Sequence, residues 1–412
     1  MSEAGEPPAP LAGVRVLDVS RFVSGPLCTF LLVSMGAEVI SVESPRTSTS
    51  RRLPPFAHPD GGSTQDYVDG ALSIPFLKRS RGKRSVALDL TRPDGARLVR
   101  AIADRSDAFV ENSRSDAMAS FGLSYEQLAA INPTLVYCAI SGYGYNAPDR
   151  PAMDNIVQAA SGVMAKTGFA DGPPVRAGIT IADHTSATFA ALGIMGALRQ
   201  RDATGRGQLV DVAMLDVLTS LVWDEPVDHY ASIGMPPRTG NADGRGAPIN
   251  TYRCADGWIS VTCTSDRQWQ RMCELMDRDD ALARWPTIRE RAGAAAEIDA
   301  AMESWTSTRP ADEVEAAMLA IGFPAGRVRE PVDAATDPDL RQRGLLAELR
   351  HPSAPPDRPS GFLGAQLPIA FEGRVDLPPA ELLGTSTDAV LRELADCDDD
   401  ELARLRADGV IA

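Results

Sequence analysis

Residues 176–216 read RAGITIADHTSATFAALGIMGALRQRDATGRGQLVDVAMLD, and this stretch places one acidic residue directly ahead of a helix and a strand. Apolar residues at helical spacing predict a helix over about residues 186–201, with Thr185 or Ser186 as its cap. A turn with two glycines follows, and the residues after it alternate as a strand. Asp183 precedes a helix N-terminus, where the helix dipole and free N–H groups stabilise a carboxylate. Asp183 is therefore either a helix cap or a reactive carboxylate.

Short apolar runs alternate with helical segments along the first half of the chain. The runs expected to be strands are residues 14–20, 37–43, 85–90, 108–112, 135–140 and 209–213. The first two flank a helix over residues 27–35, and this order predicts a βαβ unit with a parallel sheet, hence an α/β fold. Parallel strands end at one edge, where α/β sheets bind ligands, so Asn112, Tyr143 and Asp183 are expected near that edge. No GxGxxG motif follows the first strand, so nothing indicates a dinucleotide site.

Composition narrows the class of protein. A chain of 412 residues exceeds one ordinary domain, and its net charge of −15 argues against a nucleic-acid partner. The sequence has no long apolar run and no basic start, so we expect it to contain neither a membrane span nor a secretory signal. The six cysteines form no CxxC pair and the four histidines are scattered, which predicts no metal site and a reducing, cytoplasmic compartment.

Between about residues 11 and 405, several motifs follow one another in the order that one known family shows. They are VLDVS, VSGP and MGAEVI near the start, then RGKRSVALDL, VEN, a D-x-x-x-Q-A segment from Asp154, TGFADGPP, ADHTSATF and TGRGQ. Together they resemble the class III CoA-transferase family of the CaiB/BaiF type. That family includes formyl-CoA transferase, the carnitine CoA-transferase and alpha-methylacyl-CoA racemase.

The resemblance implies a fold and an assembly. The large domain would be Rossmann-like, with its parallel sheet built from both chain ends, residues 1–221 and 331–412. Residues 222–330 would form a smaller α+β middle domain. The family also implies an interlocked homodimer, in which two ring-like subunits thread each other.

The resemblance further implies an activity, namely transfer of CoA from an acyl-CoA to a free carboxylic acid. Asp183 would be the catalytic carboxylate and would form a covalent aspartyl intermediate. Coenzyme A would be a co-substrate, with no metal, no nucleic acid and no membrane involved. The residues expected to contact CoA are Arg46, Lys83, Arg84, Leu88, Asn112, Arg114 and Tyr143.

Within this set, the basic residues would face phosphates and the strand end at Leu88 would offer backbone contacts to adenine. The alternative interpretation of Arg46 is a solvated surface charge that contacts no ligand. Backbone N–H groups near Val23 and Ser24, or in a glycine-rich loop, would bind the oxyanion of each tetrahedral intermediate. The candidates for that loop are Gly240, Gly244 and Gly246. The alternative interpretation is that these glycines lie in an ordinary connection between elements. Three arginines could bind a second carboxylate of a dicarboxylic substrate or could be plain surface residues: Arg176, Arg238 and Arg245.

Two other functions are weighed against transfer. The racemase branch carries a histidine directly before the aspartate of the D-x-x-x-Q-A segment, whereas this chain has Met153, which cannot move a proton. His184 adjoins Asp183 and is expected to be a helix-start residue rather than a second base. A CoA-binding protein without catalysis is disfavoured because Asp183 is intact.

Overall fold

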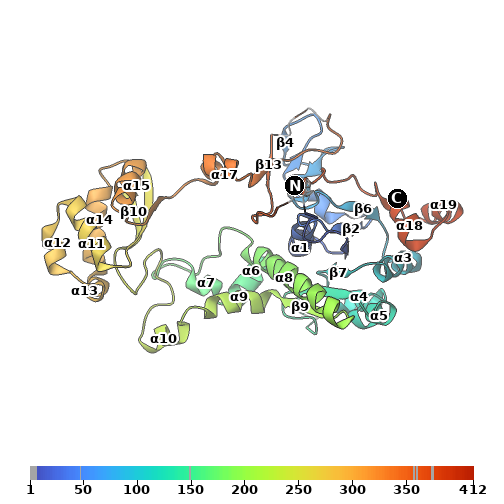
Figure 1. The fold of residues 1–412 in the computed structure, drawn as a ribbon, viewed down its shortest axis with the longest axis horizontal. Helices are drawn as coiled ribbons and strands as arrows, with labels where there is room; N and C mark the ends of the chain where they lie inside the picture. The colour runs from blue at the N-terminus through green and yellow to red at the C-terminus, as the bar shows by residue number, and fades with distance from the viewer. Residues whose placement is uncertain (1–6, 47, 148–149, 356–357, 359–360, 373–374) are drawn as a thin grey trace, which may run out of the picture. The chain divides into compact units, whose positions relative to one another are not determined.

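Contacts divide the chain into two compact units. The computed structural model describes residues 7–46, 48–147, 150–355, 358, 361–372 and 375–412. The larger unit comprises residues up to Ser161, Gly178–Leu221 and Pro338–Ala412 (Figure 1). The second unit comprises Gly162–Ala177 and Val222–Asp337, so residues of the TGFADGPP segment pack with the middle of the chain.

A six-stranded parallel sheet frames the larger unit. Its strands are β1 (Arg15–Asp18), β2 (Glu38–Glu43), β6 (Arg84–Ala87), β7 (Ala108–Glu111), β8 (Val136–Ser141) and β9 (Leu209–Ala213). They lie in the order β6-β2-β1-β7-β8-β9, and every neighbouring pair is parallel. This is the Rossmann order. Successive strands are added towards one edge of the sheet from β1 to β6 and towards the other edge from β7 to β9, which leaves a crevice at the carboxyl ends of β1 and β7. The predicted α/β fold with a parallel sheet is confirmed.

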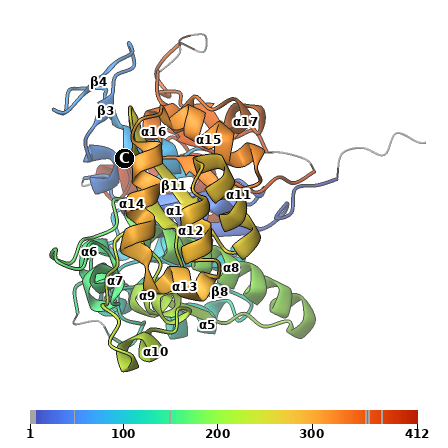
Figure 2. The same ribbon diagram turned by 90° about the vertical axis from the view of Figure 1, so that its left-hand side faces the viewer.

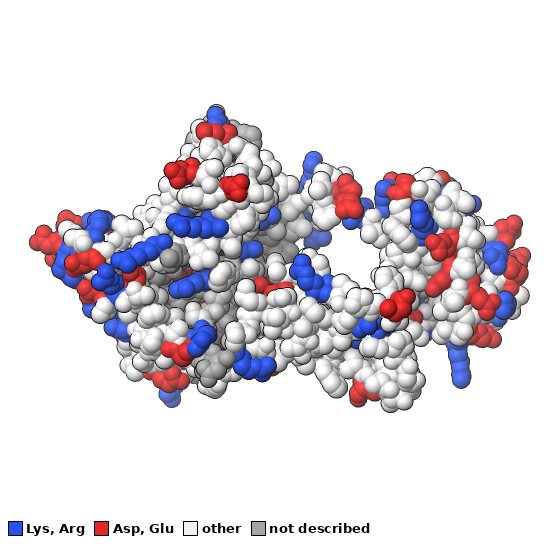
Figure 3. Space-filling view, turned by 180° about the vertical axis from the view of Figure 1, so that it is seen from behind, with Lys and Arg blue, Asp and Glu red and all other residues white. Residues whose placement is uncertain are grey.

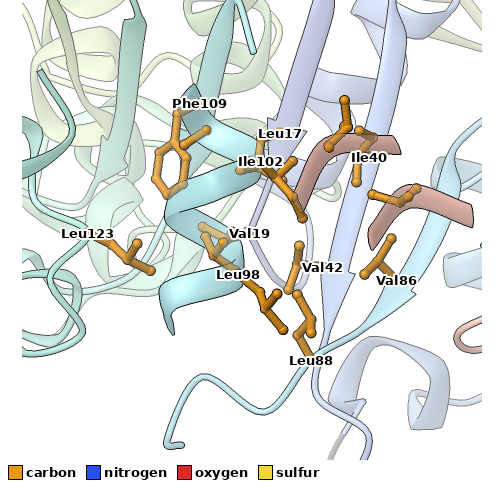
Figure 4. Packing of buried hydrophobic residues seen from close by; sticks show 14 of the residues in the cluster. Leu17, Val19, Ile40, Val42, Val86, Leu88, Leu98, Ile102, Phe109 and Leu123 are labelled. Atoms are coloured by element: carbon orange, nitrogen blue, oxygen red, sulfur yellow. The ribbon is translucent and has the colours of Figure 1, made fainter. Parts of the chain in front are cut away.

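Helices cover both faces of this sheet. Leu17, Ile40 and Val42 point to one face, where they pack with Leu98 and Ile102 of α3 (Pro93–Asp104) (Figure 4). The C-terminal helices α18 (Thr387–Ala395) and α19 (Asp399–Ala407) complete the same core. Alternate strand residues face the other side, and there α1 (Ser24–Val33) and α8 (Ile181–Thr204) pack against each other and against the strands.

The two chain ends contribute differently to this unit. All six strands of this sheet come from residues before 214, and the C-terminal segment covers the sheet with helices, whereas its own strands β13 (Leu346–Glu348) and β14 (Leu363–Ala365) form a separate two-stranded sheet. Its one strand-like contact with the sheet region is a single antiparallel bridge between Leu88 and Ile411. The expectation that both ends build the sheet itself is therefore corrected. The C-terminal segment is amphipathic and helical, so it stabilises the sheet by covering its apolar face.

Shorter elements connect these layers. They are η1 (Thr49–Arg52), β3 (Phe56–Ala57), β4 (Ser63–Thr64), β5 (Leu72–Ser73), α2 (Ile74–Arg79), α4 (Ser115–Ser120), α5 (Tyr125–Ile131), α6 (Asp154–Ala160), α9 (Met214–Trp223), α17 (Pro338–Gln342), β13 (Leu346–Glu348) and β14 (Leu363–Ala365). The segment of residues 44–67, which follows β2, contains η1, β3 and β4. Arg51 anchors it, because this buried guanidinium forms a bidentate pair with Glu43 at 2.7 Å.

The second unit is built around a small antiparallel sheet of β10 (Ile249–Cys254), β11 (Gly257–Thr262) and β12 (Ala325–Arg327). Strands β10 and β11 form an antiparallel hairpin. Five helices gather around this sheet (Figure 2): α11 (Asp266–Met276), α12 (Asp279–Arg284), α13 (Ile288–Gly293), α14 (Ala295–Thr306) and α15 (Ala311–Ala320). Trp269, Met272 and Phe323 are fully buried in its core. Three short helices belong with it: α7 (Val163–Lys166), α10 (Val227–Ser232) and α16 (Pro331–Ala335).

Charged side chains of both signs are interspersed on the face of the molecule shown in Figure 3. Among the described residues, no helix has the length and apolar character needed to cross a membrane. Within the same described part of the chain, no cluster of three or more His, Cys, Asp or Glu side chains is arranged to hold a metal ion. All six cysteines are buried and unpaired.

The buried side chain of Lys83, directly before β6, contacts the end of β1 and the helix α1. Its ammonium group lies 3.2 Å from Asp18 Oδ2 at the end of β1, 2.8 Å from Pro26 O and 2.6 Å from Thr29 Oγ1 in α1. Three acceptors match the three donors of a lysine, and only 4% of the residue is exposed. Burial lowers the pKa of Lys83, and the Asp18 carboxylate opposes that effect. The expected phosphate contact is therefore corrected, because this lysine is committed to the core.

Arg84 is also engaged within the protein. Its guanidinium pairs with Glu38 on β2 and with Glu393 on α18, in half-exposed ion pairs. These contacts raise the pKa of Arg84 against the opposing effect of burial. The two ion pairs connect the sheet to the C-terminal helix α18. They do not support the expected contact between Arg84 and a phosphate.

We expect Lys83→Met to lower the free energy of unfolding by about 3 kcal/mol, because it leaves the Asp18 carboxylate buried without its cation. Arg84→Met should cost less than about 1 kcal/mol, because its ion pairs are partly solvated. Urea denaturation followed by circular dichroism measures both variants. Equal losses in the two would contradict the structural role assigned to Lys83.

Candidate active site

The N-terminus of α8 is capped by a carboxylate from another helix. Asp154, the first residue of α6, accepts hydrogen bonds at Oδ1 from the backbone N–H of Ala182, at 2.8 Å, and of Asp183, at 3.3 Å. Its Oδ2 accepts a bond of 2.6 Å from Gln158, one turn further along α6. The carboxylate thus satisfies two of the N–H groups that an α-helix leaves unpaired at its start.

This cap moves the helix start from its expected position. The helix begins at Ile181 rather than near residue 186, and Thr180 is its N-cap residue. The side chain of Thr185 bonds back to Ile181 O inside the helix, so the expected local cap at Thr185 or Ser186 is wrong. Asp183 therefore lies in the first turn of α8, not ahead of it, and its carboxylate is near the positive end of the helix dipole.

The electrostatic surroundings of Asp183 are mixed. Burial of this half-buried side chain, together with the negative charge of Asp154, raises the pKa of Asp183 to about 6. His184 and Arg79 oppose these effects and lower the pKa. At pH 7 a carboxyl group with such a pKa is about nine-tenths ionised. Asp183 is thus a carboxylate of raised basicity at neutral pH, which favours a nucleophilic role.

His184 is held by the start of its own helix. Its Nδ1 lies 2.8 Å from Thr180 O and 3.0 Å from Thr180 Oγ1, and the side chain is exposed. Met153, directly before the capping Asp154, is 62% exposed and carries no titratable group. Neither residue supplies a second buried base beside Asp183.

A turn before α1 lies beside this site. Phe22 has a positive φ of 65°, which is unusual for a residue with a large side chain. Its N–H donates to Ser50 Oγ at 3.1 Å, and its carbonyl accepts a bond of 3.0 Å from Arg79 Nη1. These bonds hold the turn in a conformation that would otherwise be disfavoured, at the N-terminus of α1.

Asn112, at the carboxyl end of β7, fixes the same turn from the other side. Its Oδ1 accepts the N–H of Arg21 at 2.8 Å, and its Nδ2 donates to Arg21 O at 2.7 Å and to Ser24 Oγ at 3.2 Å. Asn112 and Ser24, two predicted site residues, are therefore in contact. Val23 is the N-cap residue of α1, and Ser24 is its buried first residue. The side chain of Asn112 orients the backbone here.

A cavity of about 300 Å³ opens at the carboxyl ends of β1, β2 and β6. Its lining is mostly polar and includes Arg21, Glu43, Ser48 and Asp89, together with Leu88. Leu88 is thus where the sequence predicts it, beside a cavity at the sheet edge. Arg46 lies next to this cavity, with its Nε 3.8 Å from Asp89 Oδ2 and its side chain 61% exposed.

Two other residues that the sequence predicts to bind CoA, Arg114 and Tyr143, contact side chains that do not line this cavity. Arg114 is exposed and forms a bidentate pair with Asp116. Tyr143 is half-buried after β8, and the guanidinium of Arg150 lies 3.7 Å from the centre of its ring. The structure therefore brings together Asn112, Val23 and Ser24 at the turn, and Leu88 and Arg46 at the cavity.

The glycines expected to form an active-site loop belong to the second unit. Gly240 has a φ of +65°, and its N–H donates to Gly168 O at 2.9 Å. A side chain at Gly240 would collide with the ring of Phe169. Gly244 and Gly246 follow in the same segment, ahead of β10. Their assignment to an active-site loop stays a prediction.

Three residues of this site were not identified from the sequence as functional. Asp154 and Gln158 are four residues apart in the D-x-x-x-Q-A segment, so the spacing places both on one face of a helix and could have indicated a polar contact. Arg79 belongs to a run of basic residues that precedes β6. Nothing in its local sequence separates it from Lys78, which is exposed one residue earlier.

Comparisons with known proteins define the family. The model of CoA-transferase family III matches residues 11–374. A succinyl-CoA–D-citramalate CoA-transferase of Chloroflexus aurantiacus is 34% identical over 98% of this chain and 99% of its own length. A succinyl-CoA:mesaconate CoA-transferase of Haloarcula marismortui is 34% identical over 84% of this chain and 86% of its own.

A solved structure agrees with these matches. The crystal structure of a CaiB/BaiF family protein from Brucella suis superimposes with a TM-score of 0.81 at 30% identity, covering 94% of this chain and all of that one. The chain therefore belongs to CoA-transferase family III, as its motifs predict. It is a CoA-transferase, and coenzyme A is its co-substrate.

We expect Asp154→Asn to shift the acid limb of the pH profile to lower pH. We expect the carboxylate form of Asp183 to be the reactive one, so kcat/KM should fall as the pH drops through about 6. Asparagine removes the neighbouring negative charge but keeps an oxygen that can cap α8, so the pKa of Asp183 should fall.

The measurement is kcat/KM for one acyl-CoA between pH 5 and 8 in both proteins. The phosphates of acyl-CoA titrate equally in the two series, so the difference reports on the protein. An unchanged limb, or a shift to higher pH, would contradict the coupling between the two carboxylates.

Proposed function

We propose that the enzyme transfers CoA between carboxylic acids through a covalent intermediate on Asp183. The observation that carries this proposal is the state of that carboxylate. It is half-buried, its pKa is raised to about 6, and among the described residues no cation lies within ion-pair distance of it. A carboxylate that is desolvated and not neutralised is a competent nucleophile towards a thioester.

The chemistry proceeds in two halves. Asp183 attacks the carbonyl carbon of the acyl-CoA and expels the CoA thiolate, which leaves a mixed anhydride. The thiolate then attacks the aspartyl carbonyl, so that the first acid departs and an aspartyl-CoA thioester remains. The carboxylate of the second acid attacks this thioester, and the reversed steps release the new acyl-CoA and restore Asp183. Each acyl transfer conserves one high-energy bond.

The surrounding residues support each step. The cap from Asp154 fixes the backbone of Asp183 and raises its basicity. Each tetrahedral intermediate carries an oxyanion, which needs N–H donors. We propose the backbone N–H groups of Val23 and Ser24 for this role, because Asn112 and the Phe22 turn orient them at the start of α1.

We propose that the adenosine end of CoA occupies the cavity beside Leu88. Its position at the carboxyl edge of a Rossmann sheet is the usual one for a nucleotide ligand. Arg46 and Arg21 are the basic side chains beside that cavity and are candidates for phosphate contacts. Arg114 and Tyr143 stay as weaker candidates at the same sheet edge.

The substrates are proposed to be dicarboxylic. The relatives named above act on succinyl-CoA with citramalate or mesaconate, and all of these acids carry two carboxyl groups. Racemisation is the alternative within the family that motif analysis raised. It needs a second group that moves a proton, and the exposed Met153 cannot supply one.

We also propose the interlocked homodimer and the reducing, cytoplasmic setting that the sequence predicts. Apolar side chains exposed on one stretch of the larger unit support a partner surface. Phe189 and Leu192 on α8 are 42% and 58% exposed, and Ile156 on α6 is 47% exposed. A helix that is apolar on several faces is normally covered. Six buried, unpaired cysteines support the reducing setting.

Asp183→Ala should abolish transfer while binding of CoA persists. The substitution removes the nucleophile but leaves the cavity at the sheet edge and the cap residue in place. Transfer is measured by chromatography of new acyl-CoA with a panel of free acids, and binding by calorimetry with CoA. Substantial transfer by the variant would contradict the proposal, and deuterium uptake at the α-carbon without transfer would favour racemisation.

Leu192→Glu should convert the dimer to a monomer of 43.9 kDa, because it buries a charge in the proposed partner surface. Light scattering after gel filtration measures the mass. Gln200→Glu, which adds the same charge near the exposed end of the same helix, is the control and should leave the dimer intact. A monomeric wild type, or a dimeric Leu192→Glu variant, would contradict the assembly.

A further inference from the structure

Arg79 is a desolvated cation without a counter-ion. It is the last residue of α2, its side chain is half-buried, and burial lowers its pKa. Among the described residues, no carboxylate lies within ion-pair distance of its guanidinium. Arg51, on the neighbouring η1, shows the usual arrangement, since Glu43 neutralises it in a bidentate pair. A buried arginine that lacks such a partner has the chemistry of an anion-binding group.

The guanidinium of Arg79 is held in a fixed position. Its Nη1 donates to the carbonyl of Phe22 at 3.0 Å, and Ser50 fixes the N–H of that same residue. An arginine has five N–H donors, and only this one is used within the described residues. The remaining donors form a planar fork, whose geometry matches a carboxylate.

Arg79 lies close to the reacting carboxylate but does not neutralise it. Its charge lowers the pKa of Asp183, and the charge of Asp183 opposes the desolvation of Arg79. The net pKa of Asp183 is nevertheless raised, because burial and Asp154 outweigh Arg79. The positive charge is therefore available to an anion that arrives with the substrate.

We propose that Arg79 binds the second carboxylate of a dicarboxylic acyl group while its first carbonyl reacts at Asp183. This makes Arg79 the specificity-determining residue for dicarboxylic over monocarboxylic substrates. The inference rests on the proposed function of Asp183. Two of the three arginines that the sequence suggests for this task have partners within the second unit: Arg238 donates to the carbonyls of Phe169 and Gly172, and Arg245 pairs with Asp243.

The test compares two donors of equal chain length that differ in one terminal group. Succinyl-CoA ends in a carboxylate, and butyryl-CoA ends in a methyl group. We expect the wild type to favour succinyl-CoA in kcat/KM with one fixed acceptor acid. Arg79→Gln should lower kcat/KM for succinyl-CoA by about 100-fold, as expected for loss of a charge-assisted bond to a desolvated carboxylate. Its kcat/KM for butyryl-CoA should fall by a clearly smaller factor, because the substitution also loosens the Phe22 turn and raises the pKa of Asp183 for every donor.

Lys78→Gln is the matched control, because it removes a positive charge one residue earlier on the same helix, at an exposed side chain. It should leave the preference unchanged. Arg79→Lys keeps the charge without the planar fork and should retain part of the preference. Thermal unfolding of each variant separates a folding defect from a change in specificity.

Equal losses for both donors in a folded Arg79→Gln protein would overturn the inference, because they would limit Arg79 to the Phe22 turn and the Asp183 carboxylate, which all donors share. An unchanged preference, or a wild type that does not favour succinyl-CoA, would also overturn it. Each of these results leaves Asp183 as the nucleophile. A wild type that transfers CoA from neither donor would instead overturn the proposed function, and with it this inference.

Discussion

Two carboxylates share one helix N-terminus in this enzyme, and the site depends on that arrangement. Asp154 bonds to the backbone N–H groups of Ala182 and Asp183, so it fixes the first turn of α8. Burial raises the pKa of Asp183, and the negative charge of Asp154 raises it further. The helix dipole and Arg79 limit the effect, so that the group is still largely ionised at neutral pH. Asp154 thus fixes the backbone of Asp183 and also contributes to the raised pKa of its carboxyl group.

The Rossmann sheet supplies the frame for this chemistry. The reversal of strand order between β1 and β7 brings the turn before α1 next to Asn112, which binds its backbone on both sides. Arg79 and Ser50 hold the strained residue Phe22 of the same turn. A rigid turn, a cavity at the sheet edge and a capped helix thus meet at the carboxyl end of a single sheet. This arrangement suits a reaction in which a thioester and a free acid must occupy fixed positions in turn.

Much of this fold could be predicted from the sequence, because it depends on local patterns. Each expected apolar run corresponds to one strand of the parallel sheet, and the hairpin of the second unit follows its Asp256-Gly257 turn. The family motifs also led to Asp183. What the sequence did not reveal depends on distant partners. The start of α8 was misplaced because its cap comes from Asp154, 28 residues before Ala182.

The basic residues show the same limit. Lys83 was expected to face phosphates, but its partner Asp18 is 65 residues away and its ammonium group is buried. Arg51 is also buried, and its guanidinium is bidentate to Glu43. Arg79, in the same basic run, differs from both because no carboxylate neutralises it among the described residues. Charge alone cannot separate these three roles; burial and partner distance decide them.

The most direct measurement of the central claim follows oxygen atoms through turnover. An acceptor acid labelled with ¹⁸O in its carboxylate forms the anhydride with Asp183, and attack by CoA leaves one labelled oxygen on the aspartate. The tryptic peptide of residues 177–199 contains Asp183 as its only acidic side chain. After several turnovers and digestion in unlabelled water, mass spectrometry should find ¹⁸O in this peptide. Labelled acyl-CoA product without any label in the peptide would show direct transfer between the two acids and would contradict the covalent role of Asp183.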